Sequence, residues 1–544
     1  MHRYMLPPSL YKINLSSIIN HPFVTNIFME LILLLCSFFF FSFVLLKLAK
    51  RTKLLKLPPG PRPLPIIGNM HQLYGGLIHH KLRDLAKKHG PLMHLQLGEV
   101  LTIIASSPEV AKQVYKTRDL IFSNRPSCFE SYKAVSYDFT DIIFSPYGNY
   151  WRELRKICTM ELLSTKRVQS FGSIREEETL NMIRSIISLN EGENNNNNSK
   201  VVNLSQKIFS LTYSITSRIA FGKRNKDQER FEGLVDEISK LAAGFSIADL
   251  YPSIKLLRVI SGMERKLKRV QREVDEILQN ILNEHRDQEM MMKGESGEAN
   301  KEDDLVDVLL NIQKSEDFEV PLSDNNLKAV LFDIFSAGSD TSTTILEWAI
   351  SETLKNSRIL KRAQEETRNV YNEKGNVDES RINELKYIKA IINETLRLHP
   401  SAPLLLPREC NEQCKIYGFD IPLKARIIVN AWAIARDPKF WNDAEKFNPE
   451  RFFDSESEVD YRGNDFKYIP FGAGRRICPG ITYALPNIIL PFAQLLFHFD
   501  WKLPGGLELE ALDMTERMGV TVRRKDDLKL IPILNPCSSL MKKT

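Results

Sequence analysis

The sequence feature that most constrains the fold is a glycine-rich segment around one cysteine, Phe471–Gly480, which reads FGAGRRICPG. An apolar helical pattern follows it directly over residues 484–489, so the sulfur of Cys478 is predicted to lie at a helix N-terminus. The free N–H groups and the dipole at such an end favour a thiolate over a thiol. The fold must therefore surround one anionic sulfur.

The neighbours of Cys478 suit a pocket for haem. A thiolate is a strong axial ligand for haem iron, and its electron donation assists cleavage of the O–O bond. Gly474 and Gly480 let the backbone turn tightly and approach the sulfur, Phe471 covers it from water, and Arg476 can pair with a haem propionate. The alternative is a structural buried cysteine, which would be favoured if Cys478 stood alone.

Three further motifs precede this loop. They are Ala337–Ser342 (AGSDTS), Glu394–Arg397 (ETLR) and Pro449–Phe452 (PERF). Each is weakly specific by itself, because a Glu and an Arg three residues apart occur by chance in most long helices. The ordered set resembles the signatures of the cytochrome P450 family, and the chain is identified as a member. The resemblance runs from the N-terminal apolar segment to about Pro532.

The resemblance implies a mainly α fold with small β-sheets, preceded by one transmembrane helix. It implies haem b, iron protoporphyrin IX, with Cys478 as the axial ligand and the only protein ligand of the metal. Ala337 and Gly338 would let a helix backbone approach the flat macrocycle. Trp151 and Arg155 match a W-x-x-x-R motif, and Arg408 follows the E-x-x-R helix, so the resemblance places these three side chains at the propionates.

Glu394 and Arg397 can meet on one helix face, where an exposed pair would contribute almost nothing to stability. In the family this pair is buried and joined by the arginine of P-E-R-F, here Arg451. The resemblance therefore implies a structural network of three charged side chains that holds the haem-binding core.

Asp340 and Thr341 are the candidate catalytic residues. The Thr341 hydroxyl is expected to bond the carbonyl of Ala337 and distort the helix locally, which makes room for dioxygen and water. Asp340 would then supply an acid and Thr341 a hydroxyl for proton delivery during oxygen activation. The alternative is a helix interrupted only for packing.

Substrate contact falls, by resemblance, on mainly apolar segments, which implies a hydrophobic substrate. The residues expected to line this pocket are Phe332, Phe335, Ala402, Leu404, Leu405, Met518 and Val520. The proline-rich hinge and residues 497–504 resemble plant microsomal (A-type) members, especially the group of terpenoid hydroxylases such as premnaspirodiene oxygenase. A terpenoid of plant secondary metabolism is therefore the expected substrate, with an alkaloid or a phenylpropanoid as the alternative.

The reaction implied is RH + O2 + NADPH + H⁺ → ROH + H2O + NADP⁺. No dinucleotide or flavin fingerprint occurs in the chain, so the electrons are expected from a separate membrane-bound NADPH–cytochrome P450 reductase. Arg152, Lys156 and Arg475 would help to form a basic face for this donor, and the alternative is that they are solvated surface charges. The net charge of +6 is not gathered into a tract that would bind nucleic acid.

Three other functions are open to a chain with these motifs. A haem-thiolate isomerase or dehydratase acting on hydroperoxides would not need the Asp340–Thr341 pair. A non-catalytic haem-binding membrane protein would consume no NADPH. A cysteine-dependent hydrolase would require a histidine base, and none is indicated near Cys478.

The N-terminal region predicts a membrane anchor. Residues 27–49 form an almost uncharged apolar stretch, and Lys47, Lys50, Arg51, Lys53 and Lys56 crowd its C-terminal flank. The positive-inside rule then places the catalytic domain in the cytosol, on the endoplasmic reticulum membrane. A cleaved signal peptide is the alternative, but no small-residue cleavage site precedes the basic stretch.

The expected domains are an N-terminal extension (1–26), the anchor (27–49), a basic and proline-rich hinge (50–69), the catalytic domain (70–535) and a C-terminal tail (536–544). Because Met29 would make a natural start for a short-tailed anchor, residues 1–28 are a candidate artefact of gene prediction. Recovery of peptides from upstream of Met29 would exclude that hypothesis.

Within the domain, strands are expected at 92–97 and 425–429, and helices at 270–284 and 325–355. The polar stretches 191–200 and 287–304 are expected to be solvated loops. The seven cysteines are too sparse for a disulfide framework, and Cys410 and Cys414 lack the second ligand pair of a zinc site.

Overall fold

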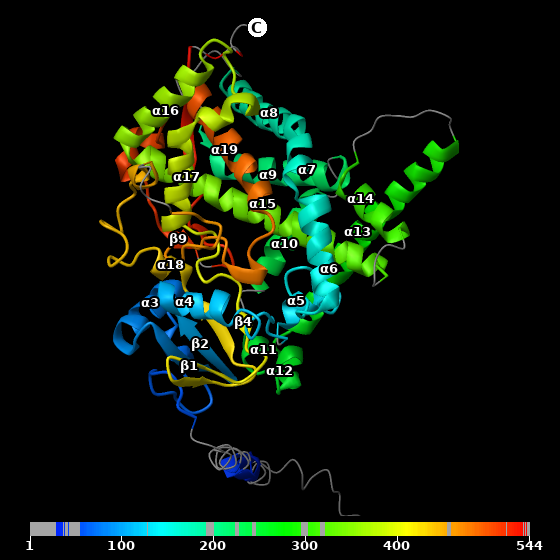
Figure 1. Cartoon of the computed structure of the whole chain (residues 1–544), viewed down its shortest axis with the longest axis vertical. Helices are drawn as coiled ribbons and strands as arrows, with labels where there is room; N and C mark the ends of the chain where they lie inside the picture. The colour runs from blue at the N-terminus through cyan, green and yellow to red at the C-terminus, as the bar shows by residue number, and fades with distance from the viewer. Residues whose placement is uncertain are drawn as a thin grey trace, which may run out of the picture. The chain divides into compact units, whose positions relative to one another are not determined.

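The computed structural model describes residues 29–35, 37–38, 42, 55–127, 129–191, 201–223, 228–241, 246–294, 303–315, 321–453, 459–517, 519–536, 538 and 540 (Figure 1). The chain divides into two compact units, Met1–Lys56 and Leu57–Thr544. The described residues of the first unit before residue 55 are helical. The predicted anchor spans residues 27–49, and its other residues lie outside the described part of the chain.

The second unit is mainly helical. Its α-helices are α3 (Ile78–His89), α4 (Pro108–Lys112), α5 (Glu130–Val135), α6 (Asn149–Ile157), α7 (Thr165–Ser170), α8 (Gly172–Glu191), α9 (Leu204–Phe221), α10 (Gln228–Leu241), α11 (Ile247–Leu250), α12 (Lys255–Ile260), α13 (Met263–Gly294), α14 (Leu305–Lys314), α15 (Asp324–Lys355), α16 (Ser357–Tyr371), α17 (Lys386–Leu398), α18 (Ala431–Ile434) and α19 (Ile481–His498). Short 3-10 or π-helical turns are η1 (Met70–Gln72), η2 (Gln113–Thr117), η3 (Cys158–Leu162), η4 (Glu379–Glu384), η5 (Pro449–Phe452), η6 (Gly474–Arg476), η7 (Pro504–Gly506) and η8 (Leu509–Ala511).

The strands form small sheets. They are β1 (Leu92–Leu97), β2 (Val100–Ala105), β3 (Val202–Asn203), β4 (Arg408–Glu409), β5 (Cys414–Ile416), β6 (Phe419–Ile421), β7 (Arg426–Val429), β8 (Phe499–Lys502), β9 (Glu516–Arg517), β10 (Arg523–Arg524) and β11 (Lys529–Leu534). The largest described sheet has the order β1-β2-β7-β4, with β2 and β7 parallel and the other pairs antiparallel. A three-stranded sheet has the order β3-β11-β8, and β5-β6 and β9-β10 are hairpins.

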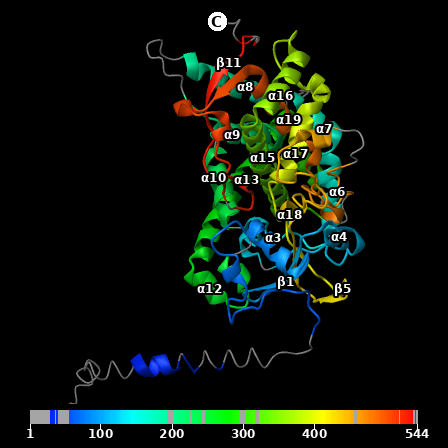
Figure 2. The same ribbon diagram turned by 90° about the vertical axis from the view of Figure 1, so that its left-hand side faces the viewer.

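Helix α15 is the central element of the second unit, and Figures 1 and 2 show it passing between α9 and α19. Its start is fixed by a capping box in which Ser323 accepts from the backbone of Asn326 and Asn326 accepts in return. Most of its residues are buried on every side, as expected for a helix with little amphipathic character. Helix α15 therefore forms a rigid wall for the groups that pack beside it.

The proline-rich segment packs against β1. The backbone N–H of His94 donates to the carbonyl of Pro59 at 2.9 Å, and the side chain of Asn69 accepts from the N–H of Gln96 at 2.8 Å. A Cβ added at Gly60 would lie 2.3 Å from the carbonyl oxygen of His94, so this close approach requires glycine. Residues 57–69, which we expected to form part of a spacer, are thus part of the second compact unit.

Most of the expected elements are present. Strand β1 covers the predicted 92–97, β7 covers most of 425–429, and α15 covers 325–355. The prediction of a solvated loop over 287–304 was wrong for its first part, because α13 extends to Gly294. Glu191 ends α8, and residues 192–200 lie outside the described residues.

Among the described helices, Ile481–His498 alone has the length and apolar composition needed to cross a membrane. That helix is α19, and most of it is buried in the protein interior beside α15. Its hydrophobicity is therefore explained by its place in the core.

Candidate active site

A largely apolar cavity of about 310 Å³ lies between α15 and the cysteine loop. Phe332, Ala337 and Thr341 of α15 form one wall, and Phe471 and Cys478 lie in another. Arginine side chains from several elements close the remaining side. The structure thus brings together, around one space, groups that are widely separated in the sequence.

The cysteine loop holds Cys478 by its backbone. The N–H of Cys478 donates to the carbonyl of Phe471 at 3.1 Å, and Gly472 and Gly474 adopt the left-handed conformation that this turn needs. Gly480 is the N-cap of α19, and its N–H bonds the sulfur of Cys478. The predicted position of the sulfur at a helix N-terminus is confirmed.

The helix end does not by itself make Cys478 a thiolate. Burial raises the pKa of its thiol, and the N–H of Gly480 and the charge of Arg155 offset this only in part. The N–H at the helix end thus acts in the expected direction, but burial is the larger effect. A metal ion bound to the sulfur would reverse the balance, since a coordinating thiol is deprotonated.

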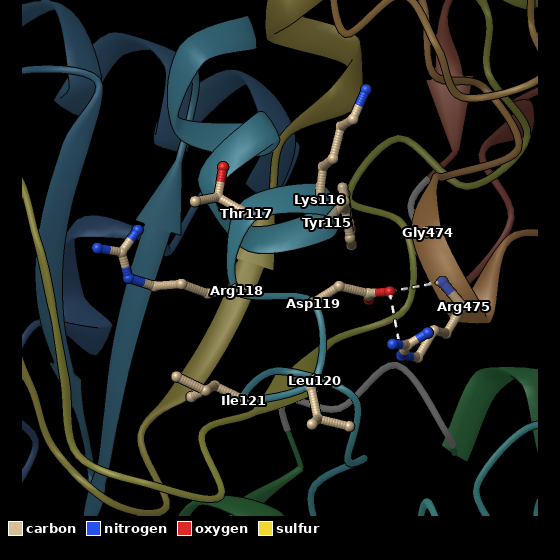
Figure 3. A pocket seen from close by; sticks show the side chains of 9 residues that line it. All are labelled: Tyr115, Lys116, Thr117, Arg118, Asp119, Leu120, Ile121, Gly474 and Arg475. Atoms are coloured by element: carbon tan, nitrogen blue, oxygen red, sulfur yellow. Dashed lines mark hydrogen bonds and ion pairs between the residues drawn. The ribbon is translucent and has the colours of Figure 1, made fainter.

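Gly474 serves a different contact from the one expected. It lies outside the cavity, and a Cβ there would come 2.2 Å from the carbonyl oxygen of Tyr115. Figure 3 shows the second pocket that it borders, of about 580 Å³, where Asp119 points toward Arg475. A carboxylate oxygen of Asp119 accepts from the backbone N–H of Arg475 at 2.9 Å. Gly474 thus joins the cysteine loop to η2, whereas Gly480 alone of the two faces the sulfur.

Four arginines surround the cavity: Arg125, Arg155, Arg408 and Arg476. Their guanidinium groups donate mainly to backbone carbonyls. Arg125 donates to the carbonyls of Ile143, Leu406 and Pro407, and Arg155 donates to that of Ile477. Arg408 donates to the carbonyls of Phe122 and Ala473, and Arg476 donates to those of Ser123 and Ser145. Arg125 was missed from the sequence. It follows η2 in an irregular segment, and no motif marks it.

These arginines carry more positive charge than the cavity wall neutralises. In the described part of the chain, their one ion pair is that of Arg408 with Asp119, at 4.0 Å. Burial, followed by the charges of neighbouring arginines, lowers the pKa of Arg476 to about 9 and depresses that of Arg125. A ligand with two carboxylates would relieve this cost, so the site fits the propionates of haem.

Trp151 lies behind these arginines. Its indole N–H donates to the carbonyl of Ile142 at 2.9 Å, and the guanidinium of Arg476 lies 4.2 Å from the centre of its ring. Arg155 lies 6.0 Å from the same ring. Trp151 therefore positions two arginines by cation–π contact, and it is not among the residues that line the cavity.

On the opposite wall, the hydroxyl of Thr341 donates to the carbonyl of Ala337 at 2.8 Å, which confirms the predicted bond. Helix α15 nevertheless continues through this turn without interruption. Gly338 also serves helix packing, because a Cβ there would lie 3.1 Å from the ring of Tyr483 in α19.

The carboxylate of Asp340 has two side-chain partners, unlike the carboxylate of a free acid. Its carboxylate forms an ion pair with Arg523 and accepts from the hydroxyl of Thr521 at 2.5 Å. Both partners belong to the C-terminal segment around β10, and Thr521 itself lines the cavity. Asp340 thus holds this segment against α15, a role that the sequence motif did not indicate.

Three of the expected pocket residues do line the cavity: Phe332, Leu405 and Val520. Phe335 points away from it and stacks on Phe231, with ring centres 4.5 Å apart. A helical residue three positions from Phe332 was expected on the same face of α15. Phe335 instead packs in the large hydrophobic core.

The remaining expected residues are elsewhere. Leu404 packs in a separate apolar cluster with Met70 and Leu85, and Ala402 is half-buried outside the cavity lining. Met518 lies outside the described residues.

The charged network around Glu394 is buried. Arg397 donates to both carboxylate oxygens of Glu394, at 2.7 and 2.8 Å, and Arg451 donates to it at 3.0 Å. Arg397 also donates to the carbonyls of Ala435 and Ala444, which tie down the segment that leads to η5. The carboxylate and both cations are thus satisfied together.

A carboxyl pair in the cavity wall was missed from the sequence. Asp333 of α15 lines the cavity, accepts from the backbone N–H groups of Ile142 and Ile143, and hydrogen-bonds Asp141. Burial and the neighbouring carboxyl raise the pKa of Asp333, and burial raises that of Asp141. One proton shared between them therefore links the segment before α6 to α15.

The three basic residues expected to form a face for the electron donor lie at the surface, and Arg475 borders the second pocket. Arg152, Lys156 and Arg475 are all exposed, and the guanidinium groups of Arg152 and Arg475 each lie 5.9 Å from the ring centre of Tyr147. Arg475 is partly neutralised by Asp119, at 3.7 Å.

The chain matches known proteins over most of its length. The family model described as cytochrome P450 matches residues 58–530. Tabersonine 16-hydroxylase 2 of Catharanthus roseus is 57% identical over 93% of this chain and 98% of its own. Premnaspirodiene oxygenase of Hyoscyamus muticus is 48% identical over 88% of this chain and 92% of its own. A zebra fish cytochrome P450 structure with progesterone has the same fold, with a TM-score of 0.70 at 23% identity over 84% of this chain and 100% of that one.

Proposed function

The chain belongs to the cytochrome P450 family, whose members use haem b with a cysteine thiolate ligand, and on that premise we propose that Cys478 is the ligand in this monooxygenase. The observation that carries the proposal is the position of Cys478 in one cavity with four arginines and the Thr341 turn of α15. When bound, haem with a thiolate supplies the activation of dioxygen.

The residues of the chain then have distinct tasks. Arg125, Arg155, Arg408 and Arg476 bind and orient the two propionates, while Phe471 limits the access of water to the sulfur. Thr341 holds a proton at its hydroxyl on the wall facing Cys478. Its bond to Ala337 fixes the position of that hydroxyl. Asp340, which we expected to act as an acid, positions the segment around Thr521 through its ion pair with Arg523.

The substrate proposed is a hydrophobic small molecule of plant secondary metabolism. The cavity lining is mainly apolar, and it includes Phe332, Leu405 and Val520, which were expected to contact the substrate. A terpenoid suits such a lining, and one of the relatives is a premnaspirodiene oxygenase. An alkaloid is the second candidate, because the relatives named for tabersonine share a larger fraction of identical residues with this chain.

The proposed location is the endoplasmic reticulum membrane, with residues 27–49 as the anchor and the catalytic domain in the cytosol. A separate NADPH–cytochrome P450 reductase would deliver the electrons. The exposed basic side chains Arg152, Lys156 and Arg475 support an acidic docking partner on that face.

The experiment is expression in microsomes with reductase, NADPH and oxygen, and with a panel of olefinic terpenes and tabersonine-type alkaloids. We expect a hydroxylated or epoxidised product whose formation requires NADPH. Carbon monoxide added to the reduced protein should give the red-shifted Soret band of a thiolate ligand, and Cys478→Ala should abolish it. Conversion of a hydroperoxide without NADPH, and no NADPH-dependent product, would instead indicate the isomerase or dehydratase.

A further inference from the structure

A cluster of histidines and one carboxylate lies outside the proposed active site, where α3, the end of α17 and the β9-β10 hairpin meet. Its members are His79 and His80 in the first turn of α3, Glu516 in β9, and His399, which caps α17. These residues are far apart in the sequence. The haem cavity uses none of them.

Three of the side chains converge. Nε2 of His79 lies 2.9 Å and Nε2 of His80 lies 3.5 Å from the same carboxylate oxygen of Glu516. The two nitrogens and the carboxylate all fall within 4.8 Å of one another. Ligand atoms about 2.1 Å from a tetrahedral zinc ion are about 3.4 Å apart, so the observed spacing needs only small adjustment.

A second observation points to a missing partner. The buried Nε2 of His80 and the buried Nδ1 of His399 have no partner with good hydrogen-bond geometry, although the Glu516 carboxylate lies beside both. His399 is only 8% exposed, and its Nδ1 lies 3.8 Å from the other oxygen of Glu516. Its Nε2 is bonded to Glu352 at 2.7 Å, and its Nδ1 faces Glu516 from outside the group of His79, His80 and Glu516. An imidazole nitrogen left without a partner in the interior is costly unless a ligand satisfies it.

The rings are held in place by surroundings that suit a metal ligand. His80 stacks on Trp432 with ring centres 4.2 Å apart, and His399 stacks on Trp348 at 4.1 Å. The side chain of Asn430 donates to the backbone carbonyl of His79 at 2.8 Å. These contacts limit the movement of the rings and of the backbone at His79.

One cation opposes a metal ion here. Arg436 lies close enough to affect the charge of both His79 and His399. It is itself paired with Glu445 and donates to the carbonyl of Leu398. The His80 side chain is 38% exposed although its Nε2 is buried, so the cluster lies close to the protein surface.

The other comparable cluster lacks these features. His285, Asp304 and Asp307 also lie within reach of one another. Both ring nitrogens of His285 are bonded, to the carbonyl of Ile281 at 2.8 Å and to Asp304 at 2.9 Å. Asp304 and Asp307 form the capping box of α14, so their carboxylates have a structural task already.

We propose that His79, His80 and Glu516 bind one zinc ion. Two imidazoles with one carboxylate form a ligand set that zinc prefers among the common divalent metals. The ion would join the first long helix of the second unit to its C-terminal hairpin. It would stabilise the folded protein and take no part in oxygen chemistry.

The test uses tag-free, haem-loaded protein that is treated with chelator, desalted, incubated with zinc sulfate and desalted again. Mass spectrometry of the metals then gives zinc per haem iron. We expect about one zinc in the unmodified protein and at least about tenfold weaker retention in His80→Gln and Glu516→Gln. Zinc should also raise the melting temperature of the unmodified protein but not that of the two variants.

His89→Gln is the matched control, because His89 lies at the other end of α3 and outside the cluster. It should retain zinc as the unmodified protein does. His80→Gln decides the result if Glu516→Gln does not fold, since His80 is half exposed. Zinc retention in the unmodified protein no greater than in His80→Gln would overturn the proposal. The readout needs no substrate turnover, so it is independent of the proposed monooxygenase function.

Discussion

Asp340 and Arg523 form an ion pair that joins the central helix to the C-terminal segment of the cavity wall. Both side chains are largely buried, at 12% and 16% exposure. A pair so placed depends on both partners, because removal of either leaves a charge that water can barely reach. Asp340 therefore has two candidate roles that can be tested against each other: it donates a proton, or it positions the C-terminal segment.

Replacement of Asp340 and of Arg523 should therefore have the same effect. We expect Asp340→Asn and Arg523→Gln each to lower stability by a few kcal/mol and to raise the KM for substrate, because the ion pair no longer fixes the segment that carries Thr521. The measurements are melting temperature and steady-state kinetics with the substrate found in microsomes. If Asp340 is the acid, Asp340→Asn will lose kcat while Arg523→Gln keeps it.

Thr341 offers the matching test on the same helix. Thr341→Val keeps the shape of the side chain but removes the hydroxyl that bonds Ala337. We expect product formed per NADPH consumed to fall by about 100-fold, the scale of one positioned proton donor. Thr341→Ser retains the hydroxyl and should keep most of the coupling. Equal coupling in the Val and Ser variants would remove the hydroxyl from the mechanism.

Arg397 is expected to be essential for haem retention. Arg397→Ala leaves Glu394 charged in the interior, at a cost on the order of 3–5 kcal/mol, and releases the backbone segment that leads to η5. The purified variant should lack haem, as shown by the ratio of Soret to protein absorbance.

Arg381 provides the control for Arg397. It also pairs with a glutamate three residues away, Glu384 at 2.7 Å, but both side chains are about half exposed. Arg381→Ala should change stability by at most about 1 kcal/mol and leave haem content unchanged. A normal haem content in Arg397→Ala would contradict the structural role of the buried network.

Much of the fold and of the cysteine loop was predictable from the sequence, because local patterns carry that information. The apolar residues after Gly480 indicated α19, and the motif with Thr341 indicated its bond to Ala337. Buried strands such as β1 were predicted from their alternating or continuous apolar residues. These features depend on neighbours within a few positions.

The errors have a common physical origin in long-range contacts. Asp340 could not be assigned to Arg523 from the sequence, because the two residues meet only through tertiary packing. Phe335 was assigned to the cavity from helix spacing, but the aromatic cluster around Phe231 determines its direction. Arg125 has no motif at all. The polar composition of 287–294 favoured a loop, yet these residues continue a long amphipathic helix.

The Asp141–Asp333 pair makes stability depend on pH. Burial raises the pKa of both carboxyls above the ordinary value of 3.8, and that of Asp141 to about 7. The folded protein then keeps a proton that the unfolded chain releases above about pH 4. Because the folded state binds more protons, the free energy of unfolding should fall as pH rises above about 4, through the raised pKa of Asp141 near 7.

Asp141→Asn should reduce this dependence. The amide can still hydrogen-bond Asp333 but carries no charge, so Asp333 can ionise without a repelling neighbour. We expect the melting temperature of the haem-loaded variant to change less between pH 5 and pH 8 than that of the unmodified protein. Asp138→Asn is the control, since Asp138 lies in the same segment with its side chain 82% exposed, and its pH profile should match the unmodified protein. The same slope in Asp141→Asn as in the control would show that the shared proton does not couple the segment before α6 to α15.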